Sequence, residues 1–183
     1  MTLKKKLGVA ALAATLMLTG CSGAAATSTQ PKPNETAVVE APKTDMAVTT
    51  FKDKTLTTKD VVIKITDVKT IPVGEKGNEY GETPVIAFWY NTTNVSGREM
   101  DAMEWLVLFS AYQDNDPNVE NELRVGLLPD DAFRQSQTAK IKKGGTVQNA
   151  VAYKLSDTTT PVKLVAATGL GSNEIGSMTF ELK

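Results

Sequence analysis

The 183-residue sequence contains no histidine and only one cysteine. Without histidine, the chain cannot form Ser-His-Asp or Cys-His catalytic arrangements or histidine-ligated zinc sites. One cysteine excludes internal disulfides and cysteine-based metal clusters. Basic residues are not in surplus, since 20 of them face 21 acidic residues, and this argues against nucleic-acid binding. Common hydrolase and nucleotide motifs are also missing, so we expect neither enzymatic activity nor a cofactor.

The N-terminus has the pattern of a signal peptide. Three lysines at positions 4–6 precede an uncharged stretch at 7–18 that is rich in Ala and Leu. Twelve helical residues rise about 18 Å, which is too short for a bilayer core of about 30 Å. We therefore predict that residues 1–20 are a signal peptide and not a membrane span.

The signal runs into Leu18-Thr19-Gly20-Cys21, which resembles the lipobox of bacterial lipoproteins. The resemblance implies that Cys21 is diacylated and becomes the mature N-terminus. Two acyl chains suffice for stable anchoring, whereas one binds membranes only marginally. An ordinary secretory signal with an incidental cysteine is the alternative.

Residues 21–46 read as a flexible linker. Positions 22–46 hold three prolines, many small polar residues and no aromatic residue. Without the three signal lysines, 17 basic residues face 21 acidic ones, so the mature chain has a net charge of -4. A domain that binds the membrane surface directly would carry the opposite sign.

Residues 47–183 show the period-2 alternation of β-strands, and the 41% hydrophobic content of the chain is enough for a packed core. The alternation slips near Asp67, which predicts a β-bulge there. Apolar residues occupy both faces of 85–93, so this strand should be interior and covered on both sides. The predicted strands are 61–71, 85–93, 104–112, 146–155, 162–168 and 178–182, with a short helical turn at 130–135.

The segment 104–112 (EWLVLFSAY) is ambiguous, because it also has apolar residues on both faces. A buried helix is an alternative, but its aromatic and β-branched content favours a strand. The strands together predict an all-β fold, an antiparallel β-sandwich preceded by the signal peptide and linker. Uneven connections favour the sandwich over an up-and-down barrel.

Four further segments stand out, namely positions 72–94, 113–118 (QDNDPN), 136–138 and 141–160, the last with a Lys-Gly-Gly turn before an alternating strand. Together they resemble a family of Gram-positive surface lipoproteins whose C-terminal module is known as domain of unknown function 5067. Such modules are similar to the telokin-like, immunoprotective extracellular, immunoglobulin-like superfamily. The resemblance implies an immunoglobulin-like sandwich on the extracellular face of a Gram-positive cell membrane. It carries no activity and no catalytic residue.

The connection at 113–136 is long and holds six acidic residues against two basic ones. Connections of this length are usually functional or disordered, although an inert decorated loop is the plainer interpretation. We hypothesise that Asp114, Asp116 and Glu120 form an acidic recognition surface for a cationic partner or calcium. An EF-hand is excluded, because Val119 stands where that loop needs glycine and Val125 where it needs glutamate.

Two other groups of residues have a plainer explanation. The aromatics at 88–90 and Trp105 could stack on a carbohydrate, but their alternation favours core packing. Lys140, Lys142 and Lys143 could meet an anionic wall polymer, but a solvated turn is the default interpretation.

These observations predict a membrane-anchored lipoprotein whose β-sandwich is a non-catalytic binding module for a protein, peptide or cell-wall ligand. The alternative is a structural accessory domain of an envelope complex, or a module that self-associates through a sheet edge.

Overall fold

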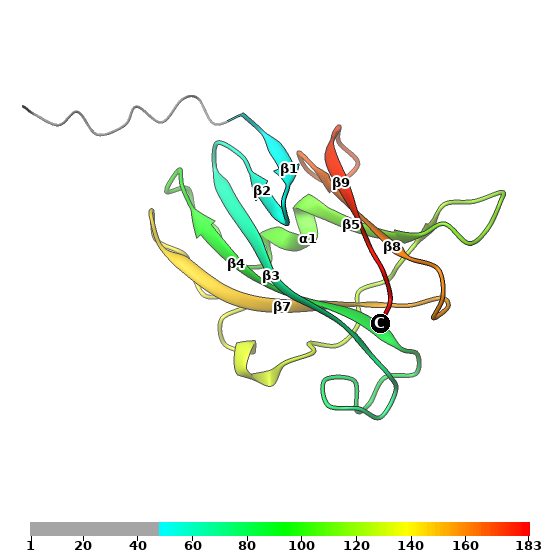
Figure 1. Ribbon diagram of the computed structural model, residues 1–183. Coiled ribbons are helices and arrows are strands. Elements are labelled where there is room, and N and C mark those ends of the chain that lie inside the picture. Colours follow the sequence, from blue (N-terminus) through cyan, green and yellow to red (C-terminus); the bar gives the residue numbers. More distant parts are fainter. Residues whose placement is uncertain (1–47) are drawn as a thin grey trace, which may run out of the picture. The chain divides into compact units, whose positions relative to one another are not determined.

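The computed structural model describes residues 48–183, so the predicted signal peptide, Cys21 and the linker lie outside the described residues. Two antiparallel sheets pack face to face (Figure 1). The larger sheet has the order β1-β2-β3-β4-β7 and the smaller has the order β6-β5-β8-β9. The prediction of an all-β antiparallel sandwich is confirmed.

The strands of the larger sheet are β1 (Thr50–Lys52), β2 (Thr55–Thr57), β3 (Val61–Ile71), β4 (Val85–Asn94) and β7 (Thr146–Lys154). Those of the smaller sheet are β5 (Phe109–Gln113), β6 (Asn121–Glu122), β8 (Val162–Ala167) and β9 (Glu174–Phe180). A short helix α1 (Glu104–Leu108) precedes β5, and a 3-10 turn η1 (Asp131–Phe133) follows β6.

The pairing of β3 with β4 shifts between Ile65 and Asp67, so the predicted bulge is confirmed. The strand β4 lies between β3 and β7, and its first four residues are all buried. One face of β4 points into the core between the sheets. The other face packs in a smaller cluster with Ile71 and Ala152, and half-buried Trp89 lies against that cluster. The prediction of an interior strand covered on both sides therefore holds.

Trp105 of α1 is fully buried at the centre of the core. Its ring lies 4.4 Å from that of Tyr90 and 4.3 Å from that of Phe109, centroid to centroid. Phe88 is 5.6 Å away, and the indole N–H of Trp105 donates to the hydroxyl of Tyr153 at 2.8 Å. The predicted core packing of Phe88, Tyr90 and Trp105 is confirmed, whereas Trp89 is half-buried on the opposite face of β4.

The prediction of a strand throughout 104–112 is wrong at its first half, where α1 stands. The backbone N–H of Glu104 donates to Asp101 O at 3.3 Å, and the carboxylate of Glu104 receives two hydrogen bonds from Arg98 at 2.9 and 2.7 Å. Within the turn, Trp105 and Leu108 are buried and three positions apart, which places them on one helix face. The run 104–112 fits both the helical and the strand period, and the helix forms where polar contacts lie at or just before its first residue.

The long connection after β5 is largely part of the fold. β6 pairs with β5, and the next residues reach β7, where Gly126 N–H donates to Ala152 O at 2.7 Å and Lys154 N–H donates to Arg124 O at 2.8 Å. The chain then crosses the outer face of the larger sheet, and Asp130 accepts a hydrogen bond from the Trp89 indole at 3.3 Å. The predicted turn at 130–135 appears as η1, with Asp130 as its N-cap. Only the tip at 114–120 projects free of the sheets (Figure 1).

β1, an edge strand of the larger sheet, lies against β9, an edge strand of the smaller sheet. A Cβ built on Gly176 would stand 3.2 Å from the carbonyl oxygen of Phe51, so glycine allows the close approach of the two strands. Phe51 itself points inward, and its ring packs edge-on to that of Phe109 at 5.2 Å. β9 spans Glu174–Phe180, whereas the sequence predicted a strand at 178–182. None of the helices in 48–183 has the length and apolar character needed to cross a membrane.

Candidate functional site

The outer face of the smaller sheet carries an open groove with a volume of about 410 Å³. Its floor is formed by side chains that alternate outward from β5 and β8. Tyr112 pairs across the strands with Lys163, and Ser110 pairs with Val165. One wall comes from α1 and another from the β8–β9 turn at 168–173, while the tip at 114–120 closes one end. Paired strands therefore form the floor of the groove, and α1 and two loops form its rim.

The groove exposes apolar surface. Leu170 in the β8–β9 turn is 75% exposed, and Val107 of α1 is 43% exposed. Tyr112 and Val165 on the floor are half-buried. Contiguous exposed apolar surface is a common mark of an interaction site.

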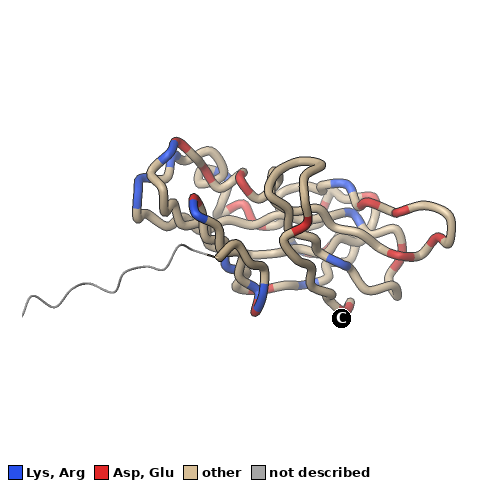
Figure 2. Tube along the Cα trace, turned by 90° about the horizontal axis from the view of Figure 1, so that it is seen from above, with Lys and Arg blue, Asp and Glu red and all other residues tan. Residues whose placement is uncertain are grey.

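Three carboxylates line the groove, namely Asp114, Glu120 and Glu174. Lys163 is the cationic side chain among the lining residues, so the groove has a net charge of -2. No salt bridge between described residues uses any of these three acids. Figure 2 shows acidic residues gathered at the end of the molecule where the 114–120 tip lies. The groove thus combines apolar contact area with uncompensated negative charge.

The base of the 114–120 tip is held in place by a polar network. The buried amide of Gln113 donates to Thr160 O at 2.7 Å and to Asp157 O at 3.1 Å, and its oxygen accepts from Ser156 N at 2.8 Å. The amide of Asn115 donates to Asp157 Oδ2 at 2.6 Å. Asn121 closes the network with a 2.9 Å bond to Asn115 Oδ1. Asp114 and Glu120 are therefore attached to a fixed frame, which reduces the entropy lost on binding.

Asp157 is the charged centre of that network. Its carboxylate accepts from the backbone N–H of Thr160 at 2.6 Å and from that of Thr159 at 2.8 Å. The Thr160 N–H, together with Asn115 and Thr159, holds the pKa of Asp157 well below its usual range. The ionised form of Asp157 thus stabilises the turn at 157–160.

The structure separates the three predicted site residues. Asp114 and Glu120 both line the groove. Asp116 does not line it, and its carboxylate accepts from the backbone N–H of Asn118 at 2.8 Å within the tip. Within residues 48–183, no three acidic or cysteine side chains gather closely enough to hold a metal ion.

Sequence reasoning missed Glu174, Leu170, Val107 and Lys163. The placement of Val107, Leu170 and Glu174 depends on the bounds of α1 and β9, which the alternation pattern did not give. That of Lys163 depends on the pairing of β8 with β5. Leu170 carried one usable signal, because a leucine between Gly169 and Gly171 is an apolar side chain in a turn. Such a residue is well placed for contact with a partner.

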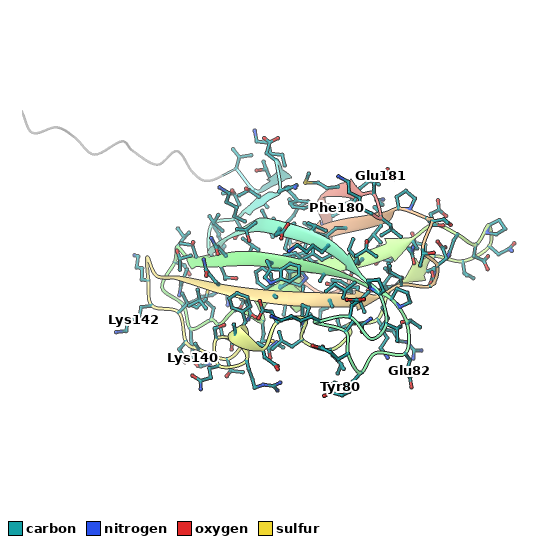
Figure 3. All side chains as sticks on the ribbon, turned by 60° about the horizontal axis from the view of Figure 1, so that its bottom comes forward. Tyr80, Glu82, Lys140, Lys142, Phe180 and Glu181 are labelled. Carbon is teal, nitrogen blue, oxygen red and sulfur yellow. The ribbon has the colours of Figure 1, made fainter. Side chains whose placement is uncertain are left out.

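The predicted basic cluster lies at the end of the sandwich opposite the 114–120 tip, where Figure 3 shows Lys140 and Lys142. Lys140 pairs with Glu99 at 2.7 Å, and this contact lowers the pKa of Glu99 and raises that of Lys140. The three lysines are therefore exposed, and Glu99 compensates the charge of Lys140.

A family model described as Domain of unknown function (DUF5067) matches residues 35–167. The fold is similar to the solved structure of a candidate lipoprotein from Staphylococcus aureus subsp. aureus NCTC 8325, with a TM-score of 0.61 and 23% sequence identity. That alignment covers 74% of this chain and 92% of the other. No curated protein sequence matches the chain significantly.

Proposed function

Since the chain belongs to the DUF5067 family, a family of unknown function, we propose that it is a lipid-anchored binding module that displays its groove outside a Gram-positive cell membrane. The groove on the smaller sheet supports this proposal, because it joins exposed apolar side chains to carboxylates on a fixed frame. The module is non-catalytic in this proposal. The lack of histidine in the sequence agrees with that.

The anchor is supported by the lipobox-like Leu18-Thr19-Gly20-Cys21 and by the similar fold of the staphylococcal candidate lipoprotein. Membership of the telokin-like, immunoglobulin-like superfamily is part of the same proposal. Cys21→Ser should prevent lipidation and move the protein from the membrane fraction to an unprocessed or released form. Normal processing and continued detergent-soluble membrane association of that variant would refute the anchor.

The binding role is tested by pull-down of the domain (Ala47 to Lys183) from envelope extracts. The pair Asp114→Asn and Glu120→Gln removes two groove carboxylates. The matched control is the pair Glu75→Gln and Glu82→Gln, which removes the same charge from exposed positions of the β3–β4 connection. Figure 3 shows Glu82 on the other side of the molecule from Phe180 of β9. The variant with the groove pair of substitutions should no longer capture material from the extracts, whereas the variant with the control pair should still capture it.

A captured set that is identical for wild type, groove pair and control pair would place binding elsewhere on the domain. A Leu170→Ser variant provides a second test that changes no charge. Because Leu170 is 75% exposed, the substitution should leave the fold intact while removing apolar contact area. Leu127→Ser, at a leucine that is 55% exposed and outside the groove, is its control.

A further inference from the structure

The acids of the groove lie at its two ends. Asp114 follows directly after β5, while Glu174 pairs with Ala167 at the far end of β8. Phe109 pairs with Ala166, and Asp114 lies five residues beyond Phe109 along the chain. Glu174 stands level with Ala167, one residue further in the opposite direction. The positions of Asp114 and Glu174 are therefore separated by about six residues along the sheet. At about 3.4 Å per residue, this corresponds to roughly 20 Å.

The floor between these ends repeats with the period of a strand. Tyr112 and Ser110 on β5 stand beside Lys163 and Val165 on β8, and successive outward side chains of one strand lie about 7 Å apart. An extended peptide has the same period, so alternate side chains of such a peptide can meet successive rows of the groove. Small-molecule sites usually bury most of the surface of their ligand. A compact small ligand on this open strip would stay largely exposed and would cover only part of the strip.

We infer that the groove receives an extended peptide segment with a basic side chain at each end and apolar side chains between them. This inference rests on the proposed binding function and names its ligand class. The net charge of -2 selects cationic partners, and the basic ends of the peptide face Asp114 and Glu120 at one end and Glu174 at the other. The apolar side chains contact Tyr112 and Val165, and Leu170 covers them from the turn.

Lys163 allows a test in which a substitution should strengthen peptide binding. This exposed lysine stands between the two acidic ends and repels a basic peptide. Lys163→Gln should therefore strengthen binding, while each acid-to-amide change should weaken it. A surface that bound peptides non-specifically through its apolar side chains would show neither effect.

The test uses a synthetic peptide with the sequence Lys-Thr-Val-Thr-Val-Thr-Lys, blocked at both ends. Its Lys and Val side chains share one face when it is extended. Binding to the domain is measured by fluorescence anisotropy at low and high salt. Three comparison ligands are used: the peptide with both Lys replaced by Glu, the peptide with both Val replaced by Ser, and free spermidine.

We expect the Lys/Val peptide to bind best and to weaken as salt rises. Asp114→Asn with Glu120→Gln should reduce its affinity about tenfold, since two exposed charge contacts are lost. Glu75→Gln with Glu82→Gln should leave it within about twofold. Leu170→Ser should weaken it severalfold, and Lys163→Gln should strengthen it.

Equal affinity for spermidine or for the Ser peptide would mean that charge alone is recognised and would overturn the inference. So would equal losses in the groove and control pairs, or the absence of measurable binding. If the peptide does not bind but the groove pair still abolishes capture from envelope extracts, the groove remains the binding site and only the ligand class is wrong. If both experiments fail, the proposed function fails with it.

Discussion

The indole N–H of Trp105 donates to the hydroxyl of Tyr153 across 2.8 Å, which ties α1 to β7 of the larger sheet. Both side chains are buried. Burial raises the pKa of the Tyr153 hydroxyl, so the group stays neutral at ordinary pH. This polar contact inside an aromatic cluster fixes which way Trp105 points.

Tyr153→Phe should destabilise the domain by about 1–3 kcal/mol, because it leaves a buried indole N–H without an acceptor. The measurement is chemical denaturation followed by tryptophan fluorescence. Tyr80→Phe is the control, since Tyr80 is 88% exposed and should change stability by less than about 0.5 kcal/mol. Equal stability of Tyr153→Phe and wild type would show that this hydrogen bond contributes nothing net.

A second prediction concerns acid stability. The folded pKa of Asp157 lies below its ordinary value of about 3.9, because backbone N–H groups and Asn115 bind its ionised form. The stabilisation is therefore present above about pH 4 and is lost as the pH falls toward the folded pKa. Asp157→Asn should lower the melting temperature at pH 7 and bring it closer to the wild-type value in acid.

Thermal unfolding of both proteins between about pH 2 and pH 7 measures this effect. Glu75→Gln is the control, since the Glu75 carboxylate makes no salt bridge or side-chain hydrogen bond with another described residue. A melting-temperature difference between Asp157→Asn and wild type that is the same at every pH would contradict the role of ionisation. The charge of the Asp157 carboxylate would then contribute nothing to stability.

How far the sequence predicted this fold depends on whether the decisive contacts are local. The bulge in β3 was predictable, because a slip in alternation at Asp67 is visible in the strand itself. The helix α1 was not, because EWLVL suits a buried strand as well as a turn of helix. Its outcome depends on Asp101 and on the Arg98–Glu104 pair, which lie outside or at the edge of the segment.

The same distinction applies to the site. Asp114 and Glu120 were predicted because acidic residues concentrate in one stretch of sequence. Glu174 joins them in the groove only because β9 pairs with β8, a contact between strands whose bounds were not all predictable. Asp116 resembled its neighbours in sequence, yet its carboxylate serves the local turn at Asn118. Composition identified the region, and strand pairing selected the residues.

The acidic residues of the 114–120 tip give a third prediction. Replacing Asp114, Asp116 and Glu120 by Asn, Asn and Gln should change stability little, because all three side chains are exposed. It should weaken binding of the partner, or of calcium if calcium is the ligand. Calorimetric titration with calcium and a thermal-shift assay measure the second alternative directly.

Asp116→Asn alone separates two roles within this triple variant. Asp116 lies outside the groove, so the single variant should keep the wild-type affinity for the peptide, whereas Asp114→Asn with Glu120→Gln should lower that affinity about tenfold. If calcium produces no heat and no thermal shift, and the triple variant retains every interaction of the wild type, the tip is not the site.

The last prediction concerns where the folded unit begins. The core between the sheets is made by residues from Phe51 onward, and the composition of 22–46 is that of a solvated linker. Deleting Ser22–Asp45 should therefore leave the melting temperature almost unchanged. The domain should also be indifferent to reducing agents, since Cys21 is the sole cysteine of the chain.

A matched deletion makes this test sharper. The family match begins at residue 35, so Ser22–Asn34 lies outside it, whereas positions 35–45 lie inside it. If the linker interpretation is right, deletion of Ser22–Asn34 and deletion of Ser22–Asp45 give the same stability in thermal and urea unfolding. A clear loss of stability with the longer deletion only would show that positions 35–45 pack against the domain, and the folded unit would then begin about a dozen residues earlier than the composition predicts.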